Sequence, residues 1–240
     1  MGPREQESAC SPCEALEGSA ALISQKNLVR RVLKPLVFLA GLGPLGYLIW
    51  AAFTDNLTAN PISEITLETG TWTLRFLCIT LSITPLRRLT GWNNAIKFRR
   101  MLGLFAFFYG ILHFTTYLWL DQFFDISNMA KDVWKRPFIT VGFATFVSML
   151  PLALTSTNGW VRRLGGRNWT RLHRLIYVAA ICGVLHYWWL VKADIQRPQR
   201  YAVIVGLLLS YRLVVAYRRR VPTRAAVERS VPADLLRRTS

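Results

Sequence analysis

The chain has 240 residues, 52% of them hydrophobic, and a formal net charge of +17. The apolar residues form long uncharged runs, which favours one polytopic membrane domain and excludes a pair of ordinary soluble domains. The basic residues cluster between these runs, as in cytoplasmic loops, and no groove-reading motif accompanies them, so we expect contact with membrane lipid and no nucleic acid.

The two ends of the chain are predicted to lie outside the membrane domain. Residues 1–27 are polar, lack the apolar stretch of a signal peptide and predict a disordered tail. They carry Cys10 and Cys13 as a single CxxC pair, which alone is weak evidence for zinc or redox chemistry. Residues 219–240 predict a basic cytoplasmic tail. The domain between them, 28–218, is predicted to be an all-α, six-helix transmembrane bundle.

Six apolar segments support this fold, and a strand assignment fails because they do not alternate with period two. In chain order they cover residues 35–54, 71–88, 101–120, 137–154, 170–192 and 201–217. The connections are alternately basic and mixed or acidic. Under the positive-inside rule, this alternation predicts that both termini are cytoplasmic.

Histidine carries the functional prediction, because ionisable residues inside a membrane are costly and usually functional. His113 and His186 lie 113 − 100 = 13 and 186 − 171 = 15 positions from the basic inner ends of two parallel segments, hence at similar depth. Two facing imidazoles at one depth suit the axial positions of one heme iron, and an iron with both positions filled favours electron transfer over oxygen chemistry. The alternative is that each histidine only forms hydrogen bonds between helices.

His173 is predicted to share one helix with His186, 13 positions earlier and roughly 20 Å away along the axis. At about 100° per residue, the two side chains point some 140° apart, so the spacing alone does not establish two stacked hemes. Arg99 and Arg100 occupy the matching depth on the segment of His113. His173 could ligate a second heme with another partner, contact heme propionates with these arginines, belong to a quinone or flavin site, or be solvated.

Three blocks of the sequence resemble the MsrQ (YedZ) family, the heme-binding membrane subunits of the MsrPQ methionine sulfoxide reductase system. This family belongs to the wider ferric-reductase-like transmembrane group. The blocks are RRMLGLFAFFYGILHFTTYLW, KRPFITVGFATFVSMLPLALTS and NWTRLHRLIYVAAICGVLHYWW. The resemblance covers about residues 30–218.

The resemblance implies a multi-pass b-type cytochrome of the bacterial inner membrane, with one or two heme b groups ligated by His113, His173 and His186. Electrons would come from the quinol pool or a flavin reductase and go to MsrP, a periplasmic molybdopterin subunit that repairs oxidised methionines in periplasmic proteins. The chain would be the electron-transfer subunit and not the catalytic one. FMN is also associated with the family, but no flavin-binding residues are matched in this sequence.

Two other functions compete with this one. A stand-alone ferric reductase-like heme protein is disfavoured because no fused FAD/NAD domain and no GxGxxG after a strand is found. A non-redox transporter or assembly factor with structural histidines is disfavoured because the sequence shows no inverted repeat and no paired broken helices.

Overall fold

The computed structural model describes residues 27–191 and 194–220, and every regular element within these ranges is a helix. Almost all of the two predicted tails, including Cys10 and Cys13, lies outside the described residues. The main helices are α2 (Lys34–Phe53), α3 (Pro61–Thr90), α4 (Ile96–Thr116), α5 (Ile126–Lys135), α6 (Pro137–Leu154), α7 (Asn158–Leu172), α8 (Leu175–Leu190) and α9 (Gln196–Arg220). Three short helical turns accompany them: η1 (Val29–Leu33), η2 (Asn93–Ala95) and η3 (Tyr117–Asp121).

Four helical stretches are long and apolar enough to cross a membrane, which indicates a multi-pass membrane protein. They are Arg31–Phe53, Asn93–Leu120, Pro137–Leu154 and Gln196–Arg218. Helix α8 is apolar but shorter, with 16 residues, and α3 has 30 residues but carries several charges. These two helices contain most of the second and fifth predicted spans.

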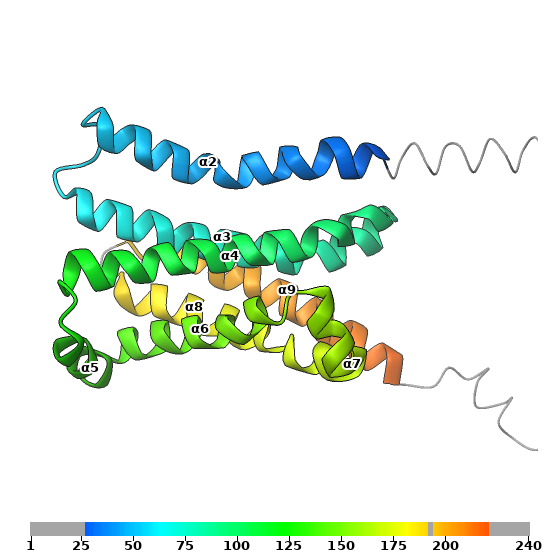
Figure 1. The fold of residues 1–240 in the computed structure, drawn as a ribbon. Helices are drawn as coiled ribbons and strands as arrows, with labels where there is room; N and C mark the ends of the chain where they lie inside the picture. Colours follow the sequence, from blue (N-terminus) through cyan, green and yellow to red (C-terminus); the bar gives the residue numbers. More distant parts are fainter. Residues whose placement is uncertain (1–26, 192–193, 221–240) are drawn as a thin grey trace, which may run out of the picture.

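The bundle is built from two antiparallel helix pairs, α3 with α4 and α6 with α8 (Figure 1). Aromatic rings join the pairs, because Phe146 of α6 stacks on Phe107 and Phe114 of α4 with centroids 5.8 and 4.8 Å apart. Helix α9 packs against α3 and α8, while α2 lies at the edge of the bundle beside α4 and α3. Helix α4, which carries His113, therefore packs on the other pair through stacked aromatic rings.

Arg212 interrupts the apolar sequence of α9, and the structure places its charge inside the bundle. Its guanidinium donates to the hydroxyl of Tyr177 at 2.8 Å, to the carbonyl of Leu81 at 2.8 Å and to the hydroxyl of Thr84 at 3.2 Å. These bonds tie the C-terminal half of α9 to α3 and α8. Hydrogen bonds to a charged group are stronger than neutral ones, which offsets part of the cost of burying the arginine.

The prediction of one continuous helix carrying both His173 and His186 is wrong. Helix α7 ends at Leu172, His173 is its C-cap, and α8 begins at Leu175. The backbone N–H of Arg174 bonds to the carbonyl of Arg171, three residues back, so the chain turns here. No glycine or proline marks this turn, and the apolar pattern continues through it, which is why the sequence concealed the break.

Tyr109 attaches the peripheral helix α2 to the core. Its side chain is fully buried, and its hydroxyl donates to the carbonyl of Gly41 at 2.9 Å while accepting from the N–H of Leu45 at 3.0 Å. These are the two groups that an i→i−4 hydrogen bond would join, and they flank Pro44, which cannot donate. Gly41 also faces Phe105, since a Cβ there would lie 2.6 Å from the phenyl ring. A tyrosine and a glycine thus let α2 approach α4 beside Pro44.

We expect Tyr109→Phe to lower the free energy of unfolding by about 1–3 kcal/mol, because a buried bridge to two main-chain groups is lost. Thermal unfolding in detergent micelles measures the change. Tyr47→Phe is the matched control, since Tyr47 lies on α2 itself, the helix that Tyr109 of α4 contacts, but is 58% exposed. Equal stability of the two variants would contradict a bridging role for Tyr109.

Candidate functional site

The structure brings two of the three histidines together between the helix pairs. His113 of α4 and His186 of α8 have ring centroids 6.0 Å apart, with the ring planes inclined by 72°. They come from segments 73 positions apart in the chain (186 − 113). Two imidazoles held face to edge at this separation form a compact centre with two nitrogen donors.

Both imidazoles are oriented by main-chain carbonyl groups. The Nδ1 atom of His113 lies 2.8 Å from the carbonyl oxygen of Thr66, and that of His186 lies 2.7 Å from the carbonyl oxygen of Phe138. A carbonyl oxygen can only accept, so Nδ1 carries the proton in each ring. In a neutral imidazole the lone pair is then on Nε2, which is how metal-ligating histidines are usually held.

A glycine makes room for each ring. A Cβ on Gly142 of α6 would lie 2.6 Å from Nδ1 of His186, and a Cβ on Gly70 of α3 would lie 2.9 Å from Cε1 of His113. Both separations are shorter than van der Waals contact. Any residue other than glycine at these positions would therefore displace the imidazole.

The two halves of the site share the same spacing between the accepting carbonyl and the glycine. Gly70 stands four positions after Thr66, and Gly142 stands four positions after Phe138. Positions i and i+4 lie on one face of a helix, so each glycine and its accepting carbonyl are one turn apart on the face that meets the histidine. The α3–α4 and α6–α8 pairs thus present their imidazoles in matching ways.

The arrangement fits a heme with two axial histidines. A metal lies roughly 2.0–2.1 Å from a bound imidazole nitrogen, so rings on opposite sides of one iron have centroids roughly 6 Å apart. The separation of 6.0 Å, the protonated Nδ1 atoms and the available Nε2 atoms meet this requirement. His113 and His186 could therefore hold such a group, which would supply a one-electron redox centre.

His173 lies away from this centre, at the corner between α7 and α8. Its ring stacks on Trp169 with centroids 3.8 Å apart, and its Nδ1 donates to the Trp169 carbonyl at 3.1 Å. Its Nε2 atom is buried and makes no hydrogen bond of good geometry to a described residue. Burial lowers the pKa of His173, and the positive charges of Arg99 and Arg100 lower it further. The main-chain carbonyls of Trp169 and Leu152 act in the opposite direction and raise this pKa, but the net shift is downward.

Arg99 and Arg100 lie close enough to His173 for their positive charges to act on its imidazole. Arg100 donates to the side-chain oxygen of Asn158, the first residue of α7, at 2.7 Å. This bond joins the start of α4 to the connection that carries His173. Gly70, Gly142 and the two accepting carbonyls were not predicted from the sequence. The glycines carry a faint signal, since small residues in apolar helices often mark close approach, but main-chain acceptors carry none.

Comparison with known proteins gives consistent matches. Residues 69–184 match the family described as ferric reductase like transmembrane component. The chain is 58% identical over 191 residues to the heme-binding subunit MsrQ of protein-methionine-sulfoxide reductase from Herminiimonas arsenicoxydans, covering 79% of this chain and 88% of that protein. It is 52% identical to the MsrQ subunit of Ralstonia nicotianae, with 80% and 89% covered. No solved structure matches.

We expect Gly142→Ala to lower the heme content of the purified protein several-fold while the protein still folds, because the new methyl group displaces the His186 ring. Gly70→Ala should have a smaller effect, since its Cβ would stand slightly farther from His113. Heme absorbance per mole of protein measures both. Gly206→Ala is the control, because nothing lies within 4 Å of a Cβ at that position. Heme loss in the control as large as in Gly142→Ala would sink the steric argument.

Proposed function

Because the chain belongs to the family of heme-binding MsrQ subunits of protein-methionine-sulfoxide reductase, we propose that it is a b-type cytochrome that serves as the electron-transfer subunit of such a system. Electrons would come from the quinol pool or a flavin reductase. The recipient would be a periplasmic molybdopterin subunit that reduces methionine sulfoxide in oxidised proteins. The observation that carries this proposal is the pair of neighbouring imidazoles, each of which donates a hydrogen bond from Nδ1 to a main-chain carbonyl.

In this proposal the chain supplies orientation, shape and exclusion of water. The carbonyls of Thr66 and Phe138 would keep Nε2 of each axial histidine turned to the iron. Stacked rings of α4 and α6 would close the site to water beside Phe114 and Phe146. Filling both axial positions with histidine would leave the iron no open position for oxygen, which favours electron transfer.

His173 would serve a second site near the inner surface, together with Arg99 and Arg100. Its buried Nε2 would be the donor to a second heme, or the cluster would bind heme propionates, a quinone or the FMN associated with the family. The positive charges beside the imidazole favour a negatively charged group there. We retain one heme at His113 and His186 as the core of the proposal.

The proposed topology has six spans, with both termini cytoplasmic and the protein in the inner membrane. Its support is the distribution of charge along the bundle. Arginines gather at one end, where α3 ends, α4 begins and α7 lies (Figure 1). The opposite end carries the α2–α3 connection and the amphipathic helix α5, whose Trp134 is 90% exposed, as in an interfacial aromatic belt.

We expect His113→Ala and His186→Ala each to abolish the low-spin heme signal, because each removes one axial ligand. His173→Ala should retain that signal from the remaining pair. Reduced-minus-oxidised spectra, electron paramagnetic resonance and heme-to-protein stoichiometry on the three purified variants measure this. The absence of b-type bands in the parent protein, or equal loss in all three variants, would contradict the assignment of the pair.

The topology predicts opposite results for two reporter fusions. Alkaline phosphatase, which is active only outside the cytoplasm, should be active when fused after Asn128 in α5 and inactive when fused after Arg218 at the end of α9. Activity of the second fusion would place the C-terminus outside and overturn the six-span arrangement.

A further inference from the structure

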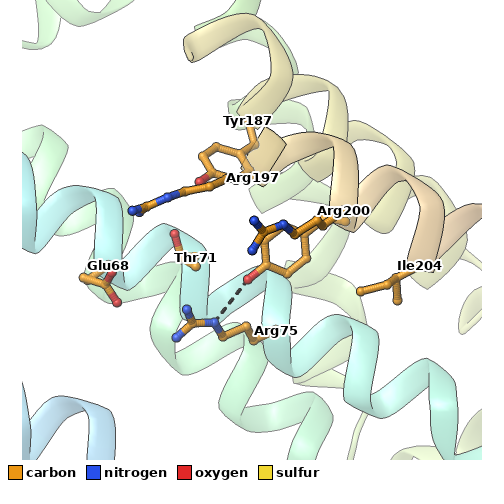
Figure 2. Close-up of a pocket in the computed structure, with 8 residues that line it drawn as sticks. Glu68, Thr71, Arg75, Tyr187, Arg197, Arg200 and Ile204 are labelled. Carbon is orange, nitrogen blue, oxygen red and sulfur yellow. Dashed lines mark hydrogen bonds between the residues drawn. The ribbon is translucent and has the colours of Figure 1, made fainter. Parts of the chain in front are cut away.

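A pocket of about 430 Å³ lies between α3, the end of α8 and the start of α9. It is separate from the histidine pair, although Tyr187, which follows His186, forms part of its wall. The guanidinium groups of Arg75, Arg197 and Arg200 lie around the side chain of Thr71 (Figure 2). Its size is within the range of small-molecule sites.

The charge around this pocket is unbalanced. Three arginines and one glutamate, Glu68, line it. Arg197 has a partner outside the lining, Asp194, at 3.0 Å. With both carboxylates counted, the three arginines leave one positive charge (3 − 2 = 1). Arginines at this end of the bundle are unexpected under the positive-inside rule, so their presence calls for a local partner.

Arg75 and Arg200 differ in how firmly their guanidinium groups are held by other residues. Arg75 is fixed, since its Nε donates to the hydroxyl of Tyr201 at 3.1 Å and its guanidinium lies 4.4 Å from the ring centroid of Trp72. Arg200 makes no hydrogen bond or salt bridge to any residue that the structure describes and is exposed. The fixed guanidinium of Arg75 and the unbonded guanidinium of Arg200 together offer several N–H donors to a single oxyanion. Planar guanidinium groups match the geometry of phosphate oxygens well.

The surface next to the pocket changes from charged to apolar along α9. Ile204 lines the pocket and is 42% exposed, and Leu207, one turn farther along, is 67% exposed. With Arg200 they stand at i, i+4 and i+7, on one face of the helix. A basic end followed by an apolar stripe matches an amphiphile with an anionic head and hydrocarbon tails.

We propose that this pocket binds the phosphodiester headgroup of an anionic phospholipid of the outer leaflet, with its acyl chains along Ile204 and Leu207. One phosphodiester charge balances the one positive charge left over in the pocket. A neutral quinone head would leave that charge uncompensated. The leaflet assignment rests on the proposed topology, whereas the binding itself does not depend on heme or on electron transfer.

The test is native mass spectrometry of the full-length protein in a neutral detergent with added lipid. We expect phosphatidylglycerol to bind about tenfold more tightly than phosphatidylcholine with the same acyl chains, and Arg200→Gln to remove about that preference, because charged hydrogen bonds to phosphate are lost. Arg200→Lys should be intermediate, since it keeps the charge but not the forked donors. Thermal unfolding confirms that each variant is folded.

Arg136→Gln is the matched control, because Arg136 lies at the same end of the bundle, is exposed and pairs with Asp132, and neither residue lines this pocket. It should keep the preference for phosphatidylglycerol. A parallel titration adds inorganic phosphate at the lipid concentration. The proposal would be overturned if the two lipids bound equally well, or if Arg136→Gln lost the preference for phosphatidylglycerol as fully as Arg200→Gln. It would also be overturned if inorganic phosphate displaced the lipid completely, because the pocket would then be a site for free anions.

Discussion

The hydrogen bond from a histidine Nδ1 to a main-chain carbonyl is the interaction on which the centre of this protein depends. It fixes the tautomer of His113 and His186, and with it the nitrogen that each ring offers to the interior of the bundle. Without a fixed acceptor, the imidazole of a histidine in an apolar helix could rotate, and either of its nitrogens could donate a hydrogen bond to whichever acceptor was near. The carbonyls of α3 and α6 remove that freedom before any ligand binds.

This constraint explains much of the surrounding architecture. Because the acceptor belongs to a helix backbone, the histidine-bearing helix must lie against it closely, and glycine is needed at the point of contact. The extensive packing of α3 on α4 and of α6 on α8 provides this closeness. Between the pairs, stacked aromatic rings of α4 and α6 make part of the contact.

The sequence predicted the helical class, the approximate positions of the apolar segments and the similar depth of His113 and His186, whose rings the structure brings together. These features follow from hydropathy and from the cost of an ionisable group in a membrane, which are local properties of the chain. The sequence could not predict the turn at His173, because the signals that usually mark a turn are missing there. Nor could it predict the pocket at Arg75 and Arg200, whose residues are 125 positions apart (200 − 75) and meet only through tertiary packing.

Thr66 and Phe138 share no side-chain chemistry, yet each performs the same task for its histidine. The contribution is made by the peptide group, so it is present whatever amino acid the gene encodes at either position, provided that the helix persists. An alanine substitution at either position would leave the carbonyl in place and so could not test this bond. The functional information of this site is thus carried partly in helix geometry, which only a backbone change, such as replacing an amide by an ester, would reveal.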